Sequence, residues 1–129
     1  MIVEDEEHLA IGLKFNLEAE GYRVTNFKDG VSALALIQAH PDDVDLLILD
    51  LMLPGMSGYN VCETLRGHGW DRPVLILSAR TLPDDRRQGF DVGANQYMSK
   101  PFDLDELISR VRNLLTLYRP HLNAPQPIV

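Results

Sequence analysis

Two short apolar runs constrain the fold of this chain more than any other feature. Residues 45–49 and 73–77 carry aliphatic side chains at both odd and even positions. Because successive side chains of a strand point to opposite faces of a sheet, both faces of these strands must be covered. Such runs are typical of central strands in a parallel sheet with helices on each side.

Amphipathic stretches alternate with the apolar runs. The first has Leu9, Leu13 and Leu17 at helical spacing and is followed by Gly21, a residue that favours a helix C-terminus. Pro83 suits the first turn of a later helix. We predict strands at 1–3, 22–27, 45–49, 73–77 and 96–99, and helices at 6–20, 30–40, 59–66, 83–93 and 103–118. Five alternations predict an α/β domain with a doubly wound, five-stranded parallel sheet and helices on both faces.

Composition narrows the class of protein. A length of 129 residues fits one domain, predicted at 1–119, and the proline-containing segment 120–129 resembles a linker-like tail. The formal charge of −7 argues against direct nucleic-acid binding and favours a basic or charge-mixed partner. The lone Cys62 excludes an internal disulfide. No apolar run approaches the ~18 residues of a membrane span, and no signal peptide is evident, so we expect a cytoplasmic protein without a membrane partner.

Chemically active side chains follow four of the predicted strands. Glu4 and Asp5 follow the first, Asp50 the third and Ser78 the fourth, and Lys100 lies beyond the fifth. The carboxyl ends of parallel strands share one edge of a sheet, where doubly wound proteins bind their ligands. Each residue alone is compatible with an ordinary solvated loop, whereas the set together predicts a functional site.

Three carboxylates at one edge repel one another. Two like charges about 4 Å apart cost ~4 kcal/mol at an effective dielectric constant of 20. A small, hard dication relieves that repulsion, and Mg²⁺ fits because it needs only one or two direct carboxylate ligands. The hydroxyl and the ammonium group would form an anion subsite beside the cation. A carboxylate nucleophile between the two favours phosphoryl transfer to aspartate.

Four segments carry a resemblance to a known family. IVEDE, LLILDLMLPGMSG, LILSAR and YMSKPF, in this order, resemble the receiver domain of two-component response regulators over residues 1–118. The segment GFDVGANQYMSKPFDLDEL is most similar to the OmpR-like subfamily, whose receivers precede a winged-helix DNA-binding domain. The resemblance implies a flavodoxin-like fold with strand order 2-1-3-4-5. It also implies an output in transcription through a DNA-binding domain that this chain does not contain.

The resemblance assigns roles around the acceptor. Asp50 matches the phosphoacceptor, which attacks the phosphohistidine of a sensor histidine kinase. Asp5 and Asp50 would bind Mg²⁺ directly, and Glu4 would act through a water molecule. Met52 would contribute its backbone carbonyl to the metal ion.

The resemblance assigns further roles to the phosphoryl subsite. Ser78 matches the switch hydroxyl that hydrogen-bonds the phosphoryl group, beside Ala79, and Lys100 would neutralise a phosphoryl oxygen. Tyr97 matches an aromatic residue that swings inward when the hydroxyl moves. The Lys100–Pro101 peptide bond is expected to be cis.

Departures from the subfamily pattern concern the start of the chain and one face. The first strand, 1–3, is shorter than in most members. Neutral Asn95 and Gln96 stand where the subfamily commonly has two aspartates, and Gln88 stands where a basic residue is usual. The subfamily forms activated dimers through the face made by 83–93, 96–99 and 103–118. We expect a homodimer through this face, with less charge complementarity to make it specific.

Three other functions share this architecture. A Mg²⁺-dependent phosphatase of the aspartyl-nucleophile kind needs a general acid at position 52, which is Met52. A flavin mononucleotide carrier needs a phosphate-binding loop after the first strand, where residues 4–7 are all acidic. A pseudo-receiver would lack acceptor residues, and all are present here. We therefore predict a phosphoacceptor signalling domain that catalyses only its own phosphorylation and dephosphorylation and acts by a population shift.

Overall fold

The computed structural model describes residues 1–118 and Val129, so the predicted tail lies almost wholly outside the described residues. Val129 is buried beside the strand edge, where its N–H donates to the Arg23 carbonyl and its carbonyl accepts from the Thr25 N–H.

A five-stranded sheet forms the centre of the molecule, in the order β2-β1-β3-β4-β5, and every neighbouring pair is parallel. The predicted fold class and strand order are confirmed. The strands are β1 (Ile2–Val3), β2 (Asn26–Phe27), β3 (Leu47–Leu49), β4 (Val74–Ser78) and β5 (Gln96–Ser99). β2 is shorter than predicted because only the last two residues of the predicted strand pair with β1, although the Thr25 carbonyl just before them accepts a hydrogen bond from the Ile2 N–H of β1.

The short first strand is nevertheless central. Its Met1 amine is buried and donates to the Leu46 carbonyl at 2.8 Å. Burial lowers the pKa of this amine from 8.0 to about 4, against an opposing effect of Asp45, so the folded chain holds it uncharged at neutral pH.

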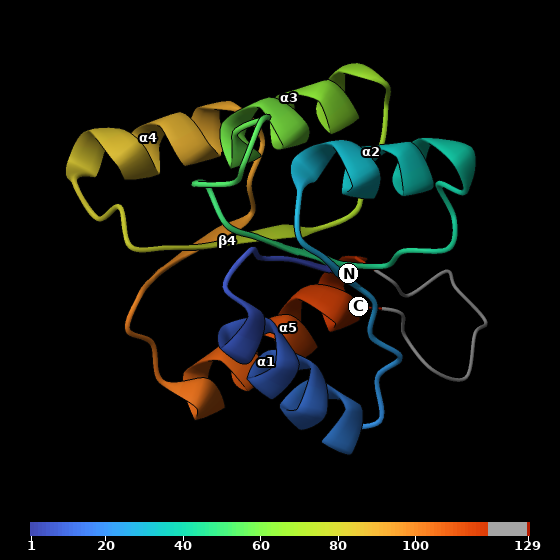
Figure 1. Ribbon diagram of the computed structural model, residues 1–129, viewed down its shortest axis with the longest axis vertical. Helices are drawn as coiled ribbons and strands as arrows, with labels where there is room; N and C mark the ends of the chain where they lie inside the picture. Colours follow the sequence, from blue (N-terminus) through green and yellow to red (C-terminus); the bar gives the residue numbers. More distant parts are fainter. Residues whose placement is uncertain (119–128) are drawn as a thin grey trace.

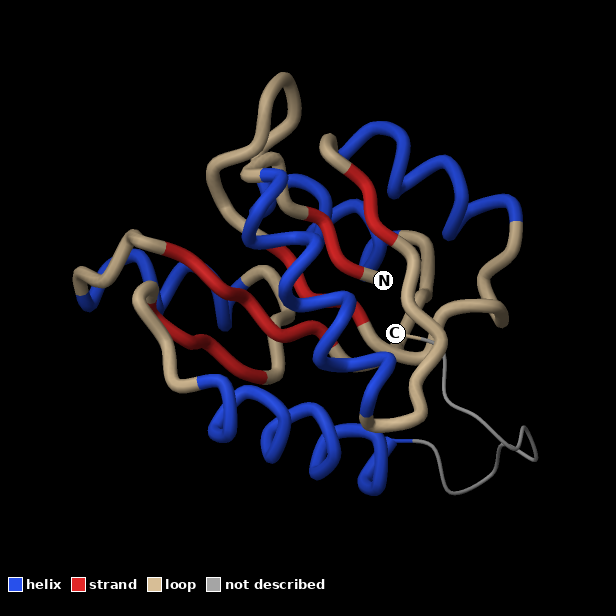
Figure 2. Tube along the Cα trace, turned by 60° about the horizontal axis from the view of Figure 1, so that its bottom comes forward, coloured by secondary structure: helices blue, strands red, loops and turns tan. Residues whose placement is uncertain are grey.

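Two layers of helices cover the sheet (Figure 1). Figure 1 shows α2, α3 and α4 on one face and α1 and α5 on the other, and Figure 2 shows the strands between them. The helices are α1 (Glu7–Ala19), α2 (Gly30–Ala39), α3 (Gly58–Gly67), α4 (Pro83–Asp91) and α5 (Leu104–Tyr118). In the part of the chain that the structure describes, no helix is long and apolar enough to cross a membrane.

The doubly apolar runs explain both layers. In the β3 segment, Leu47 and Leu49 pack in the core beneath α2 and α3, while Leu46 and Ile48 pack in the core beneath α1 and α5. One strand therefore supplies two cores by alternation alone. This burial on both faces fixes where the strand ends and hence where its next residue, Asp50, lies.

Candidate functional site

The ends of β1 and β3 bring the acidic residues together. Val3 is paired with Leu49 in the parallel ladder, and the Asp50 N–H donates to the Val3 carbonyl at 3.0 Å. Glu4 and Asp50 are buried, whereas Asp5 is exposed. One carboxylate oxygen from each of the three lies within 4.8 Å of the others.

Lys100 directly follows β5, and its side chain contacts two carboxylates of this cluster. Its Nζ donates to Glu4 Oε1 at 2.5 Å and to Asp50 Oδ2 at 3.2 Å. Its backbone N–H donates to the Ser78 carbonyl at 2.9 Å, which ties it to β4, and the Lys100–Pro101 bond is cis. The three carboxylates outnumber this one ammonium group by two.

The electrostatics of the cluster reflect this excess. Burial raises the pKa of Glu4, and the Asp50 charge adds to the rise, although hydrogen bonds from Lys100 and from the Glu6 N–H oppose it. Burial alone would lower the pKa of Lys100, yet Glu4 and Asp50 together raise it above its ordinary value. The ammonium group is therefore firmly protonated, and the carboxylates still repel one another.

Oxygen ligands with an excess of negative charge suit a hard dication. Glu4, Asp5 and Asp50 offer carboxylate oxygens close together and contribute no sulfur or imidazole. This donor set favours Mg²⁺ over softer metals. These residues therefore fit the metal ion that the sequence predicts, and they would hold it.

The loop after β3 fixes the backbone of the acceptor. The Met52 N–H donates to Asp50 Oδ1 at 3.2 Å, and the Gly58 N–H donates to the Leu51 carbonyl at 2.9 Å. A Cβ atom at Gly58 would lie only 2.2 Å from the Asp50 carbonyl oxygen. Only glycine permits this close approach of α3 to the acceptor backbone. The Met52 side chain is exposed, so the residue contacts the site through its backbone.

The hydroxyl predicted as a switch lies at the end of β4. Ser78 is fully buried, and its Oγ accepts a hydrogen bond from the Arg80 N–H at 3.2 Å. Its hydroxyl proton can therefore be donated to another group. Ala79 follows on the exposed loop. Tyr97 is buried on β5, and its hydroxyl donates to the Arg80 carbonyl.

Residues of the predicted dimer face make contacts within the chain. Arg110 donates to Gln96 Oε1 at 2.6 Å and to Glu106. Asn95 Oδ1 accepts from the Val74 N–H and from Arg66. The neutral side chains at 95 and 96 thus have partners inside the monomer.

Sequence reasoning did not single out Asp85. Asp84 and Asp85 are adjacent acids in the first turn of α4, and the structure exposes the first and buries the second. The available signal was the position of Asp85 three residues after the N-cap, where an acidic side chain can accept from the N-cap N–H. Asp85 Oδ2 accepts from the Leu82 N–H in this way.

The fold and the site together define a class of protein. A doubly wound sheet with strand order 2-1-3-4-5, three acidic residues, a serine and a lysine at its carboxyl edge is the arrangement of a signalling receiver domain. The family model described as the response regulator receiver domain matches residues 1–112, and the chain belongs to this family.

Relatives and solved structures agree with this membership. The response regulator MprA of Mycobacterium tuberculosis is 42% identical over 120 residues, which cover 93% of this chain and 51% of the relative. MprA of Mycobacterium avium is 40% identical over 124 residues, which cover 96% of this chain and 54% of the relative. The chain thus spans about half the length of these relatives.

Two solved receiver domains illustrate the structural similarity. The receiver domain of the Francisella response regulator 1452 matches with a TM-score of 0.85 at 33% identity. The match covers 90% of this chain and 94% of that receiver domain. The non-phosphorylated HemR receiver domain of Leptospira biflexa matches with a TM-score of 0.84 at 38% identity. This match covers 93% of this chain and 95% of the HemR domain.

Proposed function

We propose that this receiver domain accepts a phosphoryl group on Asp50 from the phosphohistidine of a sensor histidine kinase, in a Mg²⁺-dependent reaction. The observation that carries the proposal is the cluster itself, in which Lys100 Nζ bridges Glu4 and Asp50 while Asp5 adds a third carboxylate. Asp50 is a buried nucleophile beside one ammonium group, and the excess of negative charge around it favours a bound metal ion. Such a site is suited to accepting a phosphoryl group.

Each residue has a defined part in the transfer. A carboxylate oxygen of Asp50 bonds to phosphorus as the phosphorus–nitrogen bond of the phosphohistidine breaks, and the departing imidazole keeps the electron pair. Lys100 balances charge on a phosphoryl oxygen, and Ser78 donates its hydroxyl proton to another. Asp5, Asp50 and the Met52 carbonyl, with Glu4 through a water molecule, would hold Mg²⁺, which would supply charge neutralisation. Attack of water on phosphorus later breaks the bond to the Asp50 oxygen and releases inorganic phosphate and the free carboxylate.

The consequence of phosphorylation is a shift in a conformational equilibrium. Contacts of the phosphoryl group with Ser78, Ala79 and Lys100 favour one arrangement of the β4–α4 loop and of Tyr97. The α4–β5–α5 face carries the change to a partner or to a second copy of the chain. On the resemblance to the OmpR-like subfamily, the output is transcription through a winged-helix domain, in the cytoplasm. The domain itself catalyses only its own phosphorylation and dephosphorylation.

Acetyl phosphate tests the proposal without the kinase. Incubation of the purified chain with acetyl phosphate and MgCl₂ is expected to add the mass of one phosphoryl group, and Asp50→Asn is expected to abolish the adduct. Asp84→Asn, which changes an exposed aspartate outside the cluster, is the matched control and should retain the adduct. An unmodified wild-type chain, or an adduct that persists in Asp50→Asn, would contradict the proposal.

A further inference from the structure

One carboxylate, that of Asp85, contacts the loop between β4 and α4 at two points. Asp85 Oδ1 accepts from Arg80 Nε at 3.0 Å, and Asp85 Oδ2 accepts from the Leu82 N–H at 3.2 Å. Both oxygens are thus occupied, and the side chain is only 9% exposed. The two donors lie on the loop itself, so the first turn of α4 holds the loop at two points.

Arg80 connects this carboxylate to both elements of the proposed switch. Its backbone N–H donates to Ser78 Oγ, and its carbonyl accepts from the Tyr97 hydroxyl. Its guanidinium group pairs with Asp85. One residue therefore contacts the hydroxyl that would bind the phosphoryl group, the aromatic side chain that would respond, and the buried acid that positions the loop.

A further hydrogen bond links Asp85 to the acceptor side of the sheet. The Tyr59 hydroxyl donates to the Asp85 carbonyl at 3.2 Å. Tyr59 is the second residue of α3, directly after Gly58, which closes against the Asp50 backbone. The first turn of α4 is therefore joined to Asp50 through α3 and to Ser78 through Arg80.

The neighbouring acid shows what an ordinary first-turn residue looks like on the same helix. Asp84 is 86% exposed and pairs with Arg87 three residues later. An exposed pair of this kind contributes little to stability. Asp85, by contrast, is directed away from solvent and toward the loop.

We propose that Asp85 is a positioning residue: through Arg80 and the Leu82 N–H, it holds the β4–α4 loop in the arrangement in which the Ser78 hydroxyl can bind the phosphoryl group and Tyr97 can respond. This inference rests on the proposed function, because it assigns the residue that couples the phosphoryl subsite to α4. If the loop spends less time in this arrangement, the apparent affinity for a phosphoryl group falls in proportion to the fraction of molecules that keep the arrangement.

Beryllofluoride with Mg²⁺ is the probe, since it binds a receiver aspartate as a stand-in for the phosphoryl group; one structural neighbour is a beryllofluoride-activated DrrB receiver domain. The affinity is measured by titration for the wild type, Asp85→Asn, Arg80→Gln and the double variant. Asp85→Asn keeps one oxygen that can accept from the Leu82 N–H, and it replaces the charged acceptor that faces Arg80 by an amide nitrogen, which cannot accept a hydrogen bond. Each single variant is expected to bind about tenfold more weakly, and the double variant no more weakly than either, because the pair acts as a unit.

Asp84→Asn is the matched control, since it removes an ion pair from the same helical turn, and its affinity should stay within about twofold of the wild type. A variant that fails to fold is recognised by circular dichroism, and Arg80→Gln guards against that outcome because the Arg80 side chain is half exposed. Equal affinity in folded Asp85→Asn, Arg80→Gln and wild type would overturn the inference.

Hydrogen–deuterium exchange separates positioning from simple stabilisation. In the wild type, beryllofluoride is expected to slow exchange in residues 79–92. If Asp85 is merely structural, Asp85→Asn changes the exchange rates equally with and without beryllofluoride. If Asp85 is a positioning residue, beryllofluoride slows exchange less in Asp85→Asn than in the wild type. Failure of the proposed function has another signature, namely no phosphoryl adduct in the wild type itself.

Discussion

Two aspartates flank β3, and their surroundings differ in one respect. Asp45 precedes the strand and Asp50 follows it, and they are 5% and 7% exposed. The same residue type, equally buried, thus lies at each end of one strand. At the amino end one guanidinium group faces one buried carboxylate, whereas at the carboxyl end two buried carboxylates share one ammonium group.

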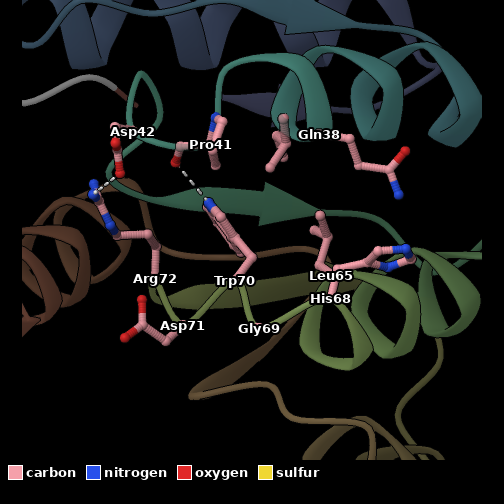
Figure 3. A pocket seen from close by; sticks show the side chains of 10 residues that line it. Gln38, Pro41, Asp42, Leu65, His68, Gly69, Trp70, Asp71 and Arg72 are labelled. Atoms are coloured by element: carbon pink, nitrogen blue, oxygen red, sulfur yellow. Dashed lines mark hydrogen bonds and ion pairs between the residues drawn. The ribbon is translucent and has the colours of Figure 1, made fainter.

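At the amino end, the guanidinium group of Arg72 neutralises the buried Asp45. Arg72 Nη1 donates to Asp45 Oδ1 at 2.8 Å, and Arg72 Nη2 donates to Asp42 at 3.1 Å. Figure 3 shows Arg72 directed toward Asp42, and the Trp70 indole donating to the Pro41 carbonyl, at the wall of a cavity of about 500 Å³. The polar groups named here are already paired, so this end of the sheet is stabilised rather than reactive.

At the carboxyl end, one lysine faces three carboxylates. The comparison of Asp45 with Asp50 indicates that burial and residue type do not distinguish a structural aspartate from a functional one. The charge balance among the neighbouring side chains does. Four measurements can break or sharpen this contrast.

The largest expected effect comes from Asp45→Asn, which leaves the Arg72 charge without its buried partner. We expect a loss of about 3 kcal/mol in the free energy of unfolding, at the low end for breaking a buried pair, because the buried Arg72 then faces only the exposed Asp42. Urea denaturation measures the loss. A change below about 0.5 kcal/mol, the range of ordinary surface substitutions, would remove the contrast between the two ends.

Mg²⁺ is expected to stabilise the wild type through the carboxyl end alone. At a concentration one hundred times its dissociation constant, a ligand that binds only the folded state adds about 2.7 kcal/mol. Thermal unfolding in MgCl₂ should therefore occur at a higher temperature than in NaCl of equal ionic strength. The shift should persist in Asp45→Asn and be largely lost in Asp50→Asn; an equal shift in both variants would place the ion elsewhere.

Without Mg²⁺, Asp50→Asn is expected to stabilise the protein by about 1 kcal/mol, since it removes one of three like charges. The same substitution thus has opposite signs at the two ends of β3. Chemical denaturation in the presence of a chelator measures the difference. Destabilisation of the same size as in Asp45→Asn would mean that Lys100 already balances the cluster.

The smallest effect is a pH dependence from Glu4. Because burial raises its folded pKa above the ordinary value of 4.5, its contribution to stability is fully present below pH 4.5 and is lost as the pH rises through the folded pKa. Acidification from pH 7 toward 4.5, without Mg²⁺, should therefore raise the melting temperature of the wild type relative to Glu4→Gln. A constant difference between the two proteins across this range would contradict the shift.

The sequence predicted the sheet and its acidic edge because both follow from local patterns. Aliphatic side chains at both odd and even positions indicated that β3 and β4 are central strands, and the residues after them were then placed at one edge by topology alone. The three carboxylates and Lys100 were named on this reasoning, and the structure brings them together.

The balanced end was not predictable in the same way. Arg72 donates to Asp45 and to Asp42, residues 27 and 30 positions away. No local pattern states which of twelve basic residues will be buried or where its partners lie. The role of Asp85 was missed for a similar reason, because its burial depends on how the β4–α4 loop closes over it.

Gly58 has a consequence for how the chain tolerates mutation. It has no ionisable group, yet any larger residue would collide with the carbonyl of Asp50. A saturation screen scored by phosphoryl incorporation would therefore group Gly58 with Asp50, and an alanine scan would mark it as essential. The sequence requirements of the site thus include one position, Gly58, that contributes by having no side chain.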